Sequence, residues 1–67
     1  MQMRAIDNGF FIISRADAIT LARSVPAALP RAGKQLLVKH DGKEWWLMQT
    51  KEEGRMEWAI YLTPGSR

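Results

Sequence analysis

The sequence has no cysteine, a single histidine and no long apolar run, and each absence removes a class of protein. Without cysteine there are no disulfides and no thiolate metal sites. His40 stands alone, so the usual partners in a structural zinc site are missing. The longest apolar runs, such as Phe10 to Ile13, are far shorter than the ~20 residues of a membrane helix. We therefore expect no metal, no cofactor and no membrane partner, and a reducing cytoplasm as the location.

The length of 67 residues fits one small domain that spans residues 1–67. A domain of this size buries only roughly 60% of the surface of its unfolded chain, so its free energy of unfolding is expected to be small. The net charge is +3, and the basic excess lies in residues 1–43. This balance suits an acidic partner, but it is also ordinary for a small solvated domain.

Turn residues predict an N-terminal hairpin and a later three-stranded antiparallel meander. Asn8-Gly9 lies between apolar runs and favours a two-residue hairpin turn that places Ile6 opposite Phe11. Asp41-Gly42 has the same turn chemistry and begins the meander. A three-residue loop over 52–54 is predicted to end its second strand. The meander strands are expected at residues 35–40, 44–50 and 56–63.

A helix is predicted over residues 14–25, between the hairpin and the meander. Ser14 and Asp17 have the spacing of a capping box, and Pro26 disfavours helical geometry at the residue before it. The helix carries one apolar stripe at i, i+3, i+4 and i+7, made of Ala18, Leu21, Ala22 and Val25. The fold class is therefore α+β, with one capped helix packed on the meander and elements in the order ββαβββ.

The predicted turns also set which side chains share a face of the sheet. Trp45 and Trp46 are neighbours in one strand, so they point to opposite faces, and both faces are apolar. We assign the helix to the face with Trp46 and Trp58. The predicted strand at residues 56–63 contains Trp58 and shows the cleanest alternation of apolar residues. The other face is then the candidate partner surface, made of Leu36, Val38, Trp45, Leu47 and Tyr61, with Lys43 at its rim.

Three occupants are open for that second face. The N-terminal hairpin can fold across it, a second copy can pack there as a homodimer, or another macromolecule can dock there. Aromatic side chains inside a polar rim are typical of protein interfaces. The sequence thus favours a small non-catalytic protein-binding module that acts through an aromatic sheet face.

Catalytic candidates are few. Ser14 is explained by its capping role, and no second histidine or nearby base activates it. His40 lies beside a turn, and Glu52-Glu53 occupies a predicted solvated loop. We therefore expect no catalytic residues and no enzyme activity.

The alternative function is that of a small basic nucleic-acid-binding protein. A sheet with exposed aromatic rings can stack bases, while nearby cations meet phosphates. The candidate cations are Arg23, Arg31, Lys34, Lys39 and Lys43. Glu57 lies on the predicted binding face, and nucleic-acid surfaces usually avoid such carboxylates.

The length and α+β format resemble those of small phage-encoded proteins that bind and block host machinery, including anti-CRISPR inhibitors. The resemblance is one of size and architecture and covers no motif. It implies a phage-type inhibitor of a host protein or complex as the narrower form of the protein-binding function.

Overall fold

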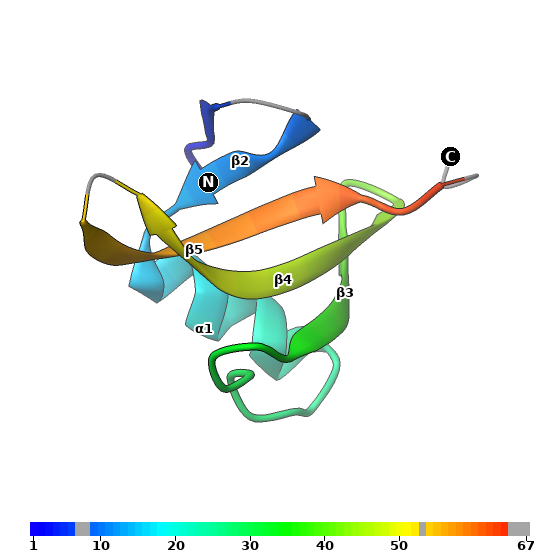
Figure 1. Cartoon of the computed structure of the whole chain (residues 1–67). Coiled ribbons are helices and arrows are strands. Elements are labelled where there is room, and N and C mark those ends of the chain that lie inside the picture. The colour runs from blue at the N-terminus through cyan, green and yellow to red at the C-terminus, as the bar shows by residue number, and fades with distance from the viewer. Residues whose placement is uncertain (7–8, 53, 65–67) are drawn as a thin grey trace.

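A computed structural model describes residues 1–6, 9–52 and 54–64 of the chain, apart from the side chain of Glu52. It confirms the α+β class and the order ββαβββ. One five-stranded antiparallel sheet, with strands in the order β1-β2-β5-β4-β3, carries the single described helix α1 on one side (Figure 1). The elements are β1 (Arg4–Ala5), β2 (Phe11–Ile13), α1 (Arg15–Ser24), β3 (Gln35–His40), β4 (Lys43–Glu52) and β5 (Arg55–Leu62).

Helix α1 begins and ends where the sequence predicts. The Ser14 hydroxyl accepts a hydrogen bond from the Asp17 backbone N–H at 3.0 Å, so Ser14 is the N-cap. At the other end Val25 is the C-cap, one residue before the proline. The predicted stripe is the buried side of the helix, through Ala18, Leu21 and Ala22.

The hairpin of β3 and β4 has the predicted turn and register. Asp41 and Gly42 have φ of 55° and 72°, the positive values that a two-residue turn of type I′ requires. The turn places Val38 opposite Trp45 and Lys39 opposite Glu44. Local turn chemistry therefore fixes the pairing of these strands.

The hairpin of β4 and β5 differs from the prediction by one residue. Glu52 pairs with Arg55, so only residues 53 and 54 lie between the strands, instead of a three-residue loop. Residue 53 lies outside the described residues, and Gly54 has a φ of 78°. The shorter loop places Trp46 opposite Tyr61 and not opposite Ile60. A shift of one residue moves each side chain of β4 to the other face relative to β5.

The N-terminal hairpin extends the sheet and does not fold across it. Strand β2 pairs with β5, with Phe11 opposite Ile60. Within the hairpin Ala5, and not Ile6, lies opposite Phe11, so the predicted two-residue turn was wrong in length. Asn8 of that turn lies outside the described residues, as does the predicted tail at residues 65–67.

The core lies between α1 and the face of the sheet that we call the inner face. Phe11 and Trp45 meet there edge to face, with ring centroids 5.8 Å apart. The loop after α1 adds Val25 and Leu29 to the same cluster. The inner-face residues of the cluster are Phe11, Ile13, Leu36, Val38, Trp45, Leu47, Trp58 and Ile60.

Candidate functional site

The opposite face of the sheet, which we call the outer face, carries apolar and aromatic side chains but no helix. The helix, Val25, Leu29 and Met3 all pack on the inner face, and Figure 1 shows α1 on that one side only. The register places on the outer face Arg4, Phe10, Ile12, Gln35, Leu37, Lys39, Glu44, Trp46, Met48, Thr50, Arg55, Glu57, Ala59 and Tyr61. An apolar sheet face with polar ends is thus left uncovered among the described residues.

A row of large side chains, which we call the aromatic row, crosses the outer face from strand to strand. Leu37 lies opposite Trp46, and Trp46 lies opposite Tyr61. The Tyr61 ring then meets the Phe10 ring, with centroids 4.7 Å apart and planes at 52°. The three rings are half-buried by their neighbours, whereas Leu37 is 38% exposed. The row is a continuous patch of the kind that protein partners bury.

The Tyr61 side chain is held across the sheet by a polar contact. The Gln35 amide donates to the Tyr61 hydroxyl at 2.9 Å, although β3 and β5 are separated by β4. The same amide lies 3.7 Å from the Met48 sulfur. The phenol must therefore extend over β4, which fixes its orientation before any partner arrives. A side chain that is already ordered loses less entropy on binding.

Charges of both signs lie around the aromatic row. On the outer face Lys39 pairs across the strands with Glu44, and Arg55 lies 3.8 Å from Glu57. Arg4 adds a further cation where β1 meets β2. The described part of this rim is therefore close to electrical balance. A mixed polar rim around an apolar centre is the usual composition of a protein interface.

The sequence-based assignment of the two faces was right for Trp58 of β5, which lies on the inner face, and wrong for β3 and β4. Trp45 is 6% exposed and Val38 and Leu47 are fully buried, all beneath the helix, where Leu36 also packs. These four residues therefore form core and not an open surface. Of the predicted partner-binding set, Tyr61 is on the outer face, and Lys43 is exposed at the β3–β4 turn. The one-residue error in the β4–β5 loop is the physical cause, because it reversed β4 against β5.

The predicted nucleic-acid-binding cations do not gather beside the aromatic row. Arg23 is exposed in the last turn of α1, on the helix side of the sheet. Arg31 and Lys34 are exposed in the segment that leads into β3, and Lys43 lies at a turn. Only Lys39 of the predicted set is on the outer face, where Glu44 lies opposite.

Two residues considered for chemistry have structural contacts instead. The Ser14 oxygen caps α1. The His40 carbonyl accepts a hydrogen bond from the Trp45 indole N–H at 3.1 Å, and the two rings lie 6.3 Å apart. His40 thus supports the buried tryptophan. In the described residues no three His, Asp or Glu side chains form a group that could hold a metal ion.

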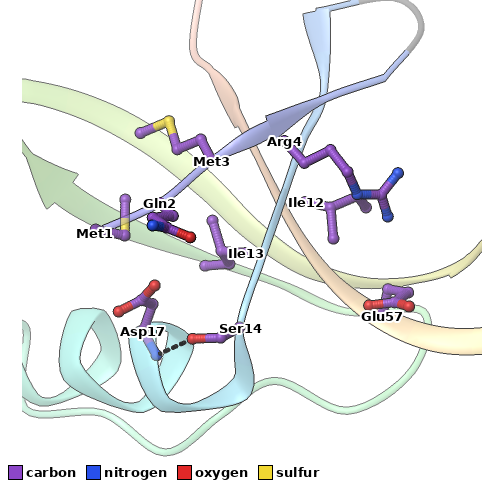
Figure 2. Close-up of a pocket in the computed structure, with 9 residues that line it drawn as sticks. All are labelled: Met1, Gln2, Met3, Arg4, Ile12, Ile13, Ser14, Asp17 and Glu57. Atoms are coloured by element: carbon purple, nitrogen blue, oxygen red, sulfur yellow. Dashed lines mark hydrogen bonds between the residues drawn. The ribbon is translucent and has the colours of Figure 1, made fainter.

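A hollow of about 640 Å³ lies where β1 begins, beside the start of α1. Its carboxylates do not converge: Figure 2 shows Asp17 on the helix and Glu57 on the far side of β2. The register agrees, because Ile13 is an inner-face residue and Ile12 an outer-face one. The lining residues are Met1, Gln2, Met3, Arg4, Ile12, Ile13, Ser14, Asp17 and Glu57. This hollow wraps around a sheet edge and offers no paired acid and base.

Five outer-face residues were not predicted as surface candidates from the sequence: Phe10, Gln35, Leu37, Trp46 and Met48. A signal was present in β3, where Gln35 and Lys39 flank Leu37 with period two and mark a wet face. Strand β5 shows the same pattern through Arg55 and Glu57. Requiring both polar sets to share one face demands the two-residue β4–β5 loop that the structure shows.

Comparison with protein-family models, with curated protein sequences and with solved structures gives no match. Among the described residues, no helix combines the length and the apolar character that a membrane crossing requires.

Proposed function

We propose that this chain is a non-catalytic protein-binding module that docks a partner protein through the outer face of its sheet. The observation that carries the proposal is the three rings of the aromatic row, Phe10, Tyr61 and Trp46, which no described helix covers. Buried aromatic anchors supply much of the binding energy in protein interfaces. The Gln35–Tyr61 hydrogen bond supports the proposal, because it orders the centre of the patch in advance.

The charges favour protein over nucleic acid as the partner. Binding to a phosphate backbone needs cations that are not neutralised by nearby carboxylates. On the outer face Lys39 lies opposite Glu44, and Arg55 lies beside Glu57. Arg23 lies on the helix side, away from the rings that would stack bases.

An inhibitory role in the cytoplasm is the narrower form of this proposal. It has two motives: the resemblance to small phage-encoded inhibitors, and the lack of cysteine, which suits a reducing compartment. A captured enzyme or complex that loses activity when the chain is added would support it.

The test is capture of a partner by the immobilised chain from a lysate of the cells that naturally contain it, with and without nuclease. Trp46→Ala in β4 and Phe10→Ala just before β2 change two ends of the ring cluster, and each should lower partner affinity about thirtyfold, the size of a 2 kcal/mol hot-spot loss. Met56→Ala is the matched control, because Met56 is 58% exposed and lies outside the outer face.

The Met56→Ala chain should bind like the unchanged one. Urea melts of each variant show whether it is still folded under the binding conditions. Equal capture by the Trp46→Ala chain, or capture that nuclease abolishes, contradicts the proposal. The second result would favour the nucleic-acid alternative.

A further inference from the structure

The two edges of the sheet differ in length. The edge at β1 is formed by two residues, Arg4–Ala5. The edge at β3 is formed by six, Gln35–His40, paired with β4 without a bulge along its whole length. Strand β3 contains no proline, and no described strand lies on its other side in the sheet order. Such an edge is a template for another strand unless something blocks it.

The backbone groups that face this edge can be identified from one hydrogen bond. The Glu44 carbonyl accepts from the Thr63 N–H at 3.2 Å, so the backbone of Glu44 faces β5. Lys39 lies opposite Glu44, and its own N–H and C=O must therefore face away from β4. The alternation along a strand gives the same direction to Leu37 and Gln35.

We propose that β3 pairs antiparallel with β3 of a second copy of this chain, with the two-fold axis at Leu37. Leu37 is the middle one of the outward-facing residues, so this register places it opposite itself and Gln35 opposite Lys39 of the other copy. All the outward-facing backbone groups are then used, in up to about six hydrogen bonds. A register centred on any other residue of β3 uses fewer of them.

The side chains of β3 are self-complementary in this register. Its single formal charge among residues 35–39 is Lys39, and it meets the neutral Gln35 amide, so no like charges lie opposite each other. Leu37, which is 38% exposed in one copy, is covered by its counterpart. An antiparallel pair keeps each face continuous, so the two five-stranded sheets join into one.

This pairing would also make the aromatic rows continuous. Leu37 is the end of the row on its strand and lies opposite Trp46. Two copies would therefore present one outer face across the axis. The dimer does not depend on the proposed partner, because its hydrogen bonds come from the backbone of β3, although Leu37 belongs to both surfaces.

The first test measures the mass of the full chain by sedimentation equilibrium at increasing concentration. The unchanged chain should dimerise reversibly. Leu37→Lys places like charges at the axis and removes the leucine contact, so the dimer dissociation constant should rise roughly tenfold or more. Met56→Lys is the matched control, with the same gain of charge at an exposed apolar residue away from the edge, and it should dimerise normally. A chain that stays monomeric, or equal effects of both variants, would overturn the proposal.

The second test determines the register of the β3–β3 pairing, and it does not require the Leu37→Lys chain to fold. The chain has no cysteine, so a single introduced thiol reports on its own surroundings. Leu37→Cys should cross-link to itself under mild oxidation, since opposed residues in a sheet are ~5.5 Å apart at Cα, within the range of a disulfide.

The matched control is Lys39→Cys, on the same strand and face. In the proposed register its counterpart is offset by a distance of about 14 Å, too far to bridge. A mixture of Gln35→Cys and Lys39→Cys chains should instead form the mixed dimer. Cross-linking of Lys39→Cys alone at the rate of Leu37→Cys would show a different contact and refute the register.

Discussion

Trp45 and Trp46 are adjacent in the sequence, but they lie on opposite faces of the sheet, and α1 covers only the face with Trp45. Trp45 is 6% exposed beneath α1, with its indole N–H bonded to the His40 carbonyl. Trp46 is half-buried on the outer face, opposite Tyr61. The same residue type thus supports folding on one face and is available to a partner on the other. The two tryptophans are equally hydrophobic, and they differ in whether α1 covers their face of the sheet.

The largest difference between the faces should appear in stability. Trp45→Ala should lower the free energy of unfolding by about 3–5 kcal/mol, because it leaves a cavity against Phe11 and removes the hydrogen bond from the indole to the His40 carbonyl. That loss is most or all of the stability of a domain this small. Trp46→Ala should cost no more than about 1–2 kcal/mol, because its ring lacks a covering helix.

Urea melts followed by circular dichroism measure both losses. If the Trp45→Ala chain were the more stable one, the helix would cover the face with Trp46. The face assignment, and with it the proposed binding surface, would then be reversed.

This comparison also shows what the sequence can predict. Ser14 with Asp17 located the start of α1, and Asp41-Gly42 located a turn and its register, because the signals are local and a single geometry satisfies each of them. The five-stranded sheet needs β2 to pair with β5, and no local signal reports a contact over that distance in the chain.

The prediction of the candidate site from the sequence failed because the length of the β4–β5 loop was ambiguous. Gly54 suits the last position of either a two-residue or a three-residue turn, so turn chemistry alone did not choose between them. Strand β4 gave no help, because Trp45 and Leu47 on one face are matched by Trp46 and Met48 on the other. The polar residues of β3 and β5 taken together would have resolved it, and they would have placed Trp46 beside Tyr61.

A smaller loss of stability is expected when the N-cap of α1 is removed. Ser14→Ala should lower the free energy of unfolding by about 1 kcal/mol, because the Asp17 N–H loses its partner. Thr20→Ala is the matched control in the same helix. The Thr20 hydroxyl donates to the Ala16 carbonyl at 3.1 Å, but that carbonyl belongs to the helix interior, and alanine is the better helix former.

Thermal or urea melts of the Ser14→Ala and Thr20→Ala chains measure stability, and binding is measured in parallel. Together they show whether the inner-face side of the molecule takes part in binding. Ser14→Ala should weaken the cover of the inner face and leave partner affinity unchanged once the fraction of folded chain is accounted for. A loss of affinity in the folded chain would mean that the start of α1 takes part in binding, and the outer face would not be the whole site.

The smallest effect concerns the outer face itself. Tyr61→Phe removes the hydroxyl that accepts from the Gln35 amide, and the amide can bond to water afterwards because this contact is exposed. We expect a stability loss below about 1 kcal/mol. A double-mutant cycle of Tyr61→Phe with Gln35→Ala should give a coupling free energy of about 0.5–1 kcal/mol, the usual size for two groups in direct contact. Partner affinity should fall by more than the stability does, since the ring must then be ordered during binding. A coupling of zero, with affinity unchanged, would mean that the hydrogen bond does not fix the ring, and preorganisation would no longer distinguish this face from an ordinary apolar surface.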